Sequence, residues 1–128
     1  MIKTKNFNPA YDKKLLCTCG HPDCDKPSVN QKTLNRLQTA RDFYGKPMSV
    51  TSGGRCSYHT DQAKKTNPKS GDHPEGNGVD IAANGATRGN IVKAGQKAGF
   101  NAIGVAKTFV HLGYREELPV GHLTMWVY

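Results

Sequence analysis

The spacing of apolar side chains divides the 128-residue chain into segments of different secondary structure. From Leu34 to Tyr44 apolar residues recur every three or four positions, which predicts a helix. Ser28, with Gln31 three residues later, has the pattern of a capping box and is expected to begin this helix. Gly45 is expected to end it, because glycine readily adopts the left-handed conformation of a helix C-terminus.

Shorter segments rich in β-branched and aromatic residues predict strands. They cover residues 48–52, 79–83, 101–106, 108–112 and 123–128. A second helix is predicted from about Thr87 to Ala98, ending at Gly99, although Gly89 and Gly95 weaken it by about 1 kcal/mol each. This order of elements predicts an α+β fold, with an antiparallel sheet and flanking helices.

The chain length predicts one domain, 1–128, because 128 residues can bury one core but not two ordinary ones. Residues 1–27 are expected to form an irregular, cysteine-containing lead-in to this domain. No apolar run is long enough to predict a transmembrane segment, and the basic N-terminus lacks the apolar stretch of a secretory signal. We therefore expect a monomer made in the cytoplasm of the cell that produces it.

The net charge narrows the class of partner. Lys and Arg number 18 against 10 Asp and Glu, which gives a formal charge of +8. Such a surface attracts acidic polymers: nucleic acid, anionic membranes or an anionic cell wall. The basic residues are dispersed, without an arginine-rich helix or alternating basic and aromatic residues, so no specific nucleic-acid partner is expected.

Four cysteines allow three interpretations. Cys17, Cys19 and Cys24 form the cluster CTCGHPDC with His21 inside it, and Cys56 stands alone downstream. Structural zinc sites usually pair two C-x2-4-C units, whereas only one cluster with C-x-C spacing is present. A zinc knuckle and a pair of disulfides both remain open, but the spacing and the expected cytoplasmic origin favour reduced, partly buried thiols.

The segment SGDHPEGNGVDI, residues 70–81, places His73 and Asp80 at the two ends of a glycine-rich loop. If the end of this segment is a strand, Asp80 shares a face with two small residues, Gly78 and Ala82, which leaves space above its carboxylate. His111 occupies a similar polar position in TFVHL, where its neighbours in sequence face the core. Spacing alone leaves open a metal site and a solvated turn with an unrelated structural histidine.

Three motifs in a fixed order resolve this choice. They are SGGRCSYH (52–59), SGDHPEGNGVDI (70–81) and GVAKTFVHLG (104–113). Their order resembles the D-alanyl-D-alanine carboxypeptidase family of zinc peptidases, which includes phage endolysin peptidases and shares its fold with the hedgehog signalling domain. The motif positions that match are Ser52, Gly53 and Arg55, then Ser70, His73, Gly76 and Asp80, then the F-V-H of 109–111.

The resemblance implies a Zn²⁺ cofactor held by His73, Asp80 and His111. It also implies that Arg55 binds a substrate carboxylate or stabilises the developing oxyanion, a task that suits a planar guanidinium. Substrate-site roles follow for two serines, Ser52 and Ser70, which are expected to orient loops by local hydrogen bonds. His59, beside the first motif, is expected to have a structural or supporting role.

The chain departs from the family pattern at the general base that a metallopeptidase needs. Relatives carry an acid or histidine two or three residues before the third ligand, where this chain has Phe109 and Thr108. The phage-type branch carries an aspartate two residues after it, where this chain has Gly113. Gly78 likewise replaces the usual alanine.

Four residues remain as candidates for the base: Asp72, Glu116, Glu117 and His122. We select His122, because an imidazole has the ordinary pKa best suited to proton transfer near neutral pH.

The predicted function is zinc-dependent cleavage of peptide bonds in bacterial peptidoglycan, at the cell wall, in the periplasm or from a virion. The alternative is a zinc-stabilised module without catalytic activity, which binds cell wall or a phage structural partner; the missing base favours it. A third interpretation is a nucleic-acid-binding protein that uses CTCGHPDC as a knuckle.

Overall fold

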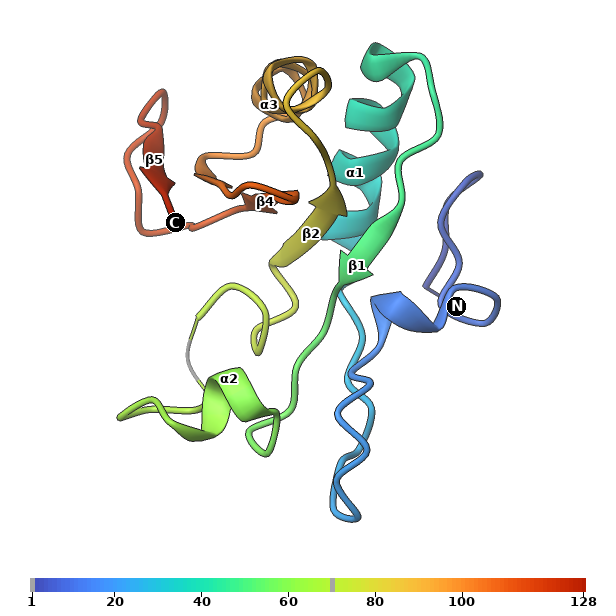
Figure 1. Ribbon diagram of the computed structural model, residues 1–128, viewed down its shortest axis with the longest axis vertical. Coiled ribbons are helices and arrows are strands. Elements are labelled where there is room, and N and C mark those ends of the chain that lie inside the picture. The colour runs from blue at the N-terminus through green and yellow to red at the C-terminus, as the bar shows by residue number, and fades with distance from the viewer. Residues whose placement is uncertain (1, 70) are drawn as a thin grey trace.

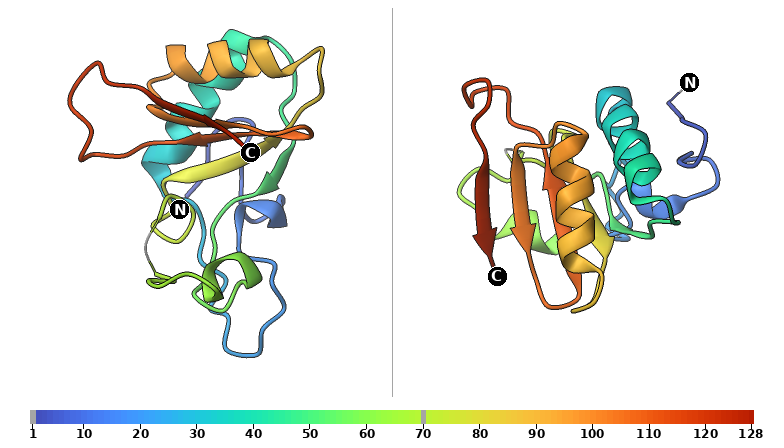
Figure 2. Two further views of the ribbon diagram at one scale, coloured as in Figure 1. Left: turned by 60° about the vertical axis from the view of Figure 1, so that its left-hand side comes forward. Right: turned by 90° about the horizontal axis from the view of Figure 1, so that it is seen from above.

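The computed structural model describes residues 2–69 and 71–128, and Ser70, predicted to lie in the substrate site, falls outside them. Two long helices lie on one face of a five-stranded sheet, and long loops extend from the other face (Figures 1 and 2). The elements are η1 (Lys13–Leu15), α1 (Gln31–Tyr44), β1 (Val50–Ser52), α2 (Thr60–Ala63), β2 (Gly78–Ala82), α3 (Arg88–Lys97), β3 (Ala102–Val105), β4 (Phe109–Gly113) and β5 (Thr124–Val127). The predicted α+β class is confirmed.

The sheet is mixed, with strand order β1-β2-β4-β3-β5. The predicted antiparallel pairing holds for every pair except β3 and β5, which run parallel. β5 runs opposite to β4, as it would after a hairpin, but the long connection through 114–123 carries the chain across β3. β5 therefore pairs with the far edge of β3, a strand of its own direction, instead of with β4.

The residue that caps the N-terminus of helix α1 lies two positions later than the sequence predicts. The side chain of Asn30, not Ser28, accepts a hydrogen bond from the backbone N–H of Thr33 (2.8 Å). Ser28 instead pairs with Leu16 in an isolated β-bridge. The predicted C-terminus is confirmed, because Gly45 ends the helix with φ of 77°.

The core lies between the sheet and the two long helices. The side chains of Val79 and Ile81 on β2 and of Val110 and Leu112 on β4 are completely buried. They pack in one cluster with apolar residues of α1 and α3. The residues that alternate with them therefore face the opposite side of the sheet, as the period of two in a strand requires.

Helix α3 contains a matched pair of glycines that tests this packing. A Cβ at exposed Gly89 would meet nothing within 4 Å, whereas a Cβ at Gly95 would lie 2.5 Å from Cδ2 of the buried Leu112. We expect Gly89→Ala to raise the free energy of unfolding by about 0.5–1 kcal/mol. Gly95→Ala should lower it, because overpacking of about 1–3 kcal/mol exceeds the gain in helix propensity. Urea unfolding of both variants measures the difference; shifts of the same sign and size would contradict this account.

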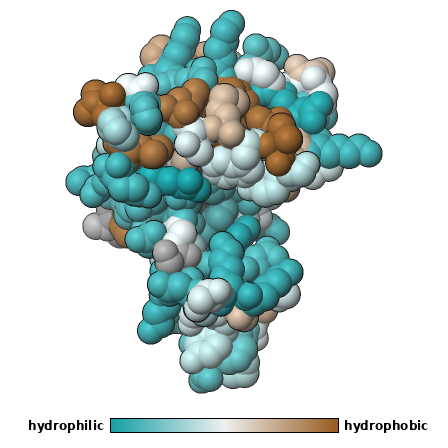
Figure 3. Space-filling model, turned by 90° about the vertical axis from the view of Figure 1, so that its left-hand side faces the viewer, coloured by the Kyte–Doolittle hydropathy of each residue, from teal (hydrophilic) through white to brown (hydrophobic). Residues whose placement is uncertain are grey.

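The C-terminal edge carries most of the exposed large apolar side chains. On the connection before β5 and on β5 itself they are Val120, Leu123, Met125, Val127 and Tyr128. Figure 3 faces this side of the molecule and shows apolar surface gathered over its upper part. Within 2–69 and 71–128, no helix combines the length and the apolar character that crossing a bilayer requires.

Candidate metal centre

Three predicted ligands meet on the sheet face opposite the helices. Asp80 on β2 and His111 on β4 are direct cross-strand partners. Oδ1 of Asp80 lies 2.9 Å from Nδ1 of His111 and 3.2 Å from Nε2 of His73. All three side chains are buried, with 3–7% of their surface exposed. The three donor atoms thus converge on one point.

The glycine-rich loop brings His73 to the strands by turning tightly twice. Gly71 and Gly76 have φ of 119° and 75°, a region that other residues rarely adopt. The backbone N–H of Gly76 donates to the carbonyl of His73 (3.1 Å), which closes the second turn. The carbonyl of Gly76 in turn accepts hydrogen bonds from the backbone and side chain at the start of α1. The loop is therefore anchored to the helix layer while His73 faces the strands.

Each histidine is held by the ring nitrogen that faces away from the centre. Nδ1 of His73 lies 2.7 Å from the carbonyl oxygen of Gly53, which fixes the tautomer that leaves Nε2 free as a ligand. Nε2 of His111 lies 2.8 Å from Oδ2 of Asp72, and Nδ1 then faces the centre. A metal-ligating histidine is usually oriented in this way by an oxygen outside the coordination shell.

Asp72 reaches His111 through a space left by two glycines. Gly78 and Gly113 are cross-strand partners on β2 and β4. A Cβ at Gly113 would lie 2.6 Å from Oδ2 of Asp72, and a Cβ at Gly78 would lie 2.8 Å from its Cβ. Both glycines are among the positions at which the chain departs from the motifs of the family that it resembles. The space that they leave holds the carboxylate of Asp72, which neither departure indicated from the sequence.

Asp72 is fixed from its other side by Arg115. Nε of Arg115 donates to Oδ1 of Asp72 (3.0 Å), and Nη2 donates to Oδ2 (3.2 Å), a bidentate pair. The guanidinium of Arg115 also lies over the Trp126 ring, 5.1 Å from its centroid. Sequence reasoning counted Asp72 among four candidates for the base but did not find its contact with His111.

Arg55 lies beside the ligands rather than on a remote surface. Its Nη2 donates to Oδ2 of Asp80 (3.4 Å), and its Nε donates to the hydroxyl oxygen of Ser52 (3.3 Å). A second carboxylate, that of Asp61, lies 3.9 Å from Nη2. Ser52 is therefore placed to orient Arg55 directly, which gives the predicted role of this serine a specific partner.

The ionisable groups at the centre stabilise one another's charge. Burial by itself would raise the pKa of Asp80, but hydrogen bonds from His111 and His73 hold it well below its ordinary value. The pKa of Asp72 is lowered in the same way, against burial, by His111 and Arg115. Burial would lower the pKa of His111, but the carboxylates of Asp72 and Asp80 raise it. The centre thus attracts positive charge.

Two other predicted residues lie elsewhere. His59 caps the short helix α2, where its Nδ1 accepts from the backbone N–H of Asp61 (3.1 Å), which is a structural role. His122, selected from the sequence as the base, is exposed and lines a different depression with Gln96 and Phe100. The structure does not bring His122 to the metal centre, because the connection before β5 folds toward α3 and away from the ligands.

The donor set fits zinc. A tetrahedral Zn²⁺ with bonds of about 2.0–2.1 Å to nitrogen and oxygen spaces its ligand atoms about 3.3 Å apart. The separations of 3.2 and 2.9 Å from Oδ1 of Asp80 are close to this spacing. Two imidazoles and one carboxylate are also a common ligand set of catalytic zinc, in which the fourth position takes water or substrate.

The centre opens into a cleft of about 400 Å³, large enough for a peptide segment. Cations and aromatic rings share its walls with the ligands. The lining residues are Arg55, Asp61, Lys65, Gly71, Asp72, His73, Asp80, Phe109, His111, Arg115, Trp126 and Tyr128. The arrangement combines three buried side chains able to bind a metal ion, an adjacent guanidinium and an accessible surface.

Comparison with known proteins agrees with this geometry. No curated protein and no solved structure matches the chain. A family model described as peptidase M15 matches residues 7–113, a span that includes all three ligands, Arg55 and Asp72. The match covers most of the chain and ends with β4, so that Trp126 and Tyr128 line the cleft from outside it. The chain therefore belongs to the peptidase M15 family, whose members are metal-dependent peptidases.

Proposed function

We propose that the protein is a zinc peptidase that cleaves peptide bonds in bacterial peptidoglycan. The observation that carries the proposal is the convergence of His73, Asp80 and His111 at the base of a cleft that also holds Arg55. Bound zinc supplies Lewis acidity for the scissile carbonyl and lowers the pKa of a bound water to about 7.

The protein's own residues bind and orient the substrate. Arg55 presents a guanidinium that pairs with a peptide carboxylate or with the oxygen that gains charge during attack. Ser52 holds that guanidinium in place. Trp126 and Tyr128 provide an aromatic wall, with ring centroids 6.3 Å apart, against which the substrate packs.

Proton transfer is assigned to a carboxylate in the cleft. Of the described acidic residues that line it, Asp80 is a ligand and Asp72 is held by His111 and Arg115. Asp61 is the remaining one, and its side chain is half exposed. We assign Asp61 to accept the proton of the attacking water, in place of His122.

Peptidoglycan is the substrate class that best suits the charge of the molecule. The net charge of +8 favours approach to an anionic cell envelope. The stem peptides of peptidoglycan carry free carboxylates, which an arginine beside the reaction centre can bind. The structure of the cleft supports a peptide substrate, and the charge supports an acidic one.

Release of peptides from purified peptidoglycan tests the proposal. We expect the protein to release amino groups or shortened stem peptides, detected by mass spectrometry of the muropeptides. A chelator should abolish release, and added Zn²⁺ should restore it, because without the metal the pKa of water is far too high to supply hydroxide at neutral pH.

The control is the same digestion with the Arg55→Ala variant. This variant should retain zinc, but its rate of peptide release should fall by about 10²–10³-fold, because Arg55 no longer stabilises the charge that develops during attack. Zinc binding without turnover of any muropeptide would contradict the proposed peptidase activity on peptidoglycan. That result would support instead a cell-wall-binding module without catalytic activity. The masses of the products also identify the bond that is cut.

A further inference from the structure

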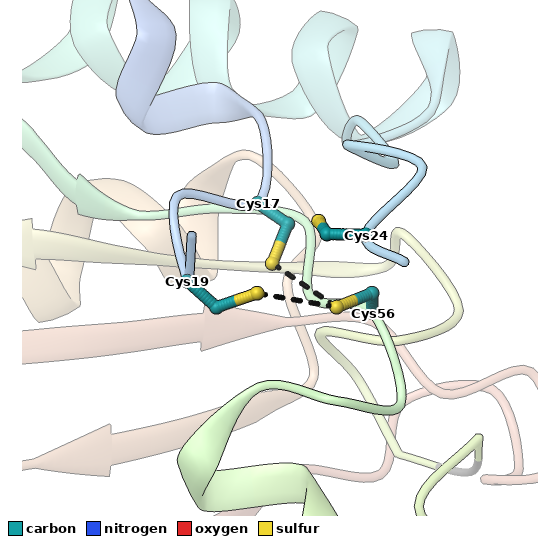
Figure 4. Close-up of side chains that lie close together, drawn as sticks. All are labelled: Cys17, Cys19, Cys24 and Cys56. Atoms are coloured by element: carbon teal, nitrogen blue, oxygen red, sulfur yellow. Dashed lines mark hydrogen bonds between the residues drawn. The ribbon is translucent and has the colours of Figure 1, made fainter. Parts of the chain in front are cut away.

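A second cluster of metal-binding side chains lies outside the cleft. The sulfur atoms of Cys17, Cys19, Cys24 and Cys56 all lie within 4.8 Å of one another. Sγ of Cys56 is 3.4 Å from Sγ of Cys19 and 3.6 Å from Sγ of Cys17. Figure 4 shows the four side chains directed from two separate segments of the chain toward one shared space.

These separations match a metal site rather than disulfides. Tetrahedral zinc with Zn–S bonds of about 2.3 Å spaces its sulfur ligands about 3.8 Å apart. A disulfide would hold Sγ of Cys56 about 2.0 Å from Sγ of a single partner. All four cysteines are free, and Cys56 is close to two of them at once.

The backbone around the cluster is shaped to donate hydrogen bonds to sulfur. The N–H of His21 donates to Sγ of Cys19 (3.5 Å), and the N–H of Lys26 donates to Sγ of Cys24 (3.3 Å). Each donor lies two residues after its cysteine. Lys26 is the single non-glycine residue with positive φ among those described, 53°. Such donors favour the thiolate, which is the form that binds metal.

The two segments that carry the cysteines have almost no apolar core of their own. Residues 16–28 form a ribbon closed by hydrogen bonds such as that from the N–H of Cys17 to the carbonyl of Pro27 (3.0 Å). Residues 53–69 and 71–77, which include the short helix α2, lie on the same side of the sheet (Figure 1). Among the described residues of both segments, the buried apolar side chains are Cys17 and Cys56. Regions this poor in core commonly depend on a metal or a disulfide for stability.

We propose that the four cysteines bind a structural zinc ion that joins the lead-in segment to the loop of the active site. All four tetrahedral positions are taken by sulfur, so the site has no open position for substrate, unlike the centre in the cleft. The thiol protons pass to solvent as the metal binds. From the sequence, the C-x-C spacing and the expected cytoplasmic origin favoured free thiols, whereas Cys56, the fourth proposed ligand, reaches the cluster through the fold.

The position of Cys56 connects this site to substrate binding. In the sequence, Gly53 and Gly54 are followed by Arg55 and then directly by Cys56. The N–H of Gly54 donates to the carbonyl of Leu15 (3.1 Å), while the carbonyl of Gly53 holds the ring of His73. A metal on Cys56 therefore fixes the segment that positions both Arg55 and His73.

Metal content of matched variants tests the proposal without any measurement of activity. We expect the purified full chain to contain about two zinc ions and His73→Ala about one, measured by mass spectrometry of the metal. A thiol-specific mercurial should release that remaining zinc from His73→Ala. His21→Ala is the matched control within the cysteine loop. Its Nδ1 accepts from the backbone N–H of Asp23, so the side chain serves the loop and both metals should remain.

Cobalt substitution of the unmodified chain keeps the test independent of folding in the variants. We expect Co²⁺ in the cysteine site to give intense thiolate-to-metal charge-transfer absorption, retained in His73→Ala and lost in Cys24→Ser. Absence of that absorption from the unmodified chain, or metal-free His73→Ala, would overturn the proposal. Neither readout depends on peptidase activity, so failure of the proposed function would leave this inference standing.

Discussion

We expect His111→Ala to remove the metal from the cleft and to lower peptidase activity by about 10³-fold or more. With His111 gone, two protein ligands remain, and catalytic zinc ordinarily needs three. Without zinc the pKa of the attacking water is no longer lowered to about 7, which accounts for a loss of this size. His73→Ala should have the same effect, since its Nε2 is the ligand on the other side of Asp80.

Zinc content and muropeptide release are measured on the same preparations. His122→Ala is the matched control, because His122 is exposed and lies outside the cleft. It should keep both the metal and the activity. A His111→Ala variant that retains activity would show that the reaction does not use this centre, whatever the cysteine cluster binds.

The cluster of His73, Asp80 and His111 could be predicted because each residue lies in a recognisable local motif. Strand alternation placed Asp80 and His111 on polar positions with buried neighbours, and the order of the three motifs joined them to His73. Their direct pairing across β2 and β4 could not be predicted, because register depends on contacts between distant segments.

The residues that the sequence did not reveal are those that act through another segment. Asp72 orients His111 only because Gly78 and Gly113 become cross-strand partners and leave space for its carboxylate. In the sequence these are two unrelated glycines. Cys56 likewise looked isolated until the lead-in ribbon packed against the segment that contains it.

The same reason explains the errors in the fold. Ser28 has the sequence of a helix cap, but pairing with Leu16 takes it into the lead-in ribbon and leaves Asn30 to cap α1. β5 was predicted as a strand, but the choice of β3 as its partner depends on the path of the preceding connection and on the free edge of β3. His122 was selected because imidazoles commonly transfer protons near neutral pH, a property of the residue type that carries no information about position.

Asp72 provides the second large expected effect. We expect Asp72→Ala to weaken zinc binding in the cleft by about 10–100-fold, since loss of the group that orients a ligating histidine has this effect on metal affinity or activity. Asp72→Asn should fall between, because the amide oxygen can still accept from Nε2 of His111 but no longer carries the charge that Arg115 pairs with. Competition with a fluorescent zinc chelator measures the affinity, and saturating zinc should restore part of the activity.

Comparing the Asp72→Ala and Asp61→Asn variants distinguishes a residue that orients His111 from one that accepts the proton of the attacking water. Asp61 lines the cleft without contacting a ligand histidine, so its substitution should lower the rate by about 10²–10⁴-fold and leave zinc affinity unchanged. Asp72→Ala should instead change the affinity first. Gly113→Ala should weaken zinc binding even with Asp72 in place, because the added Cβ would lie 2.6 Å from Oδ2 of Asp72 and 2.8 Å from Nε2 of His111. Unchanged zinc affinity in Asp72→Ala would contradict the orienting role and return Asp72 to the candidates for the base.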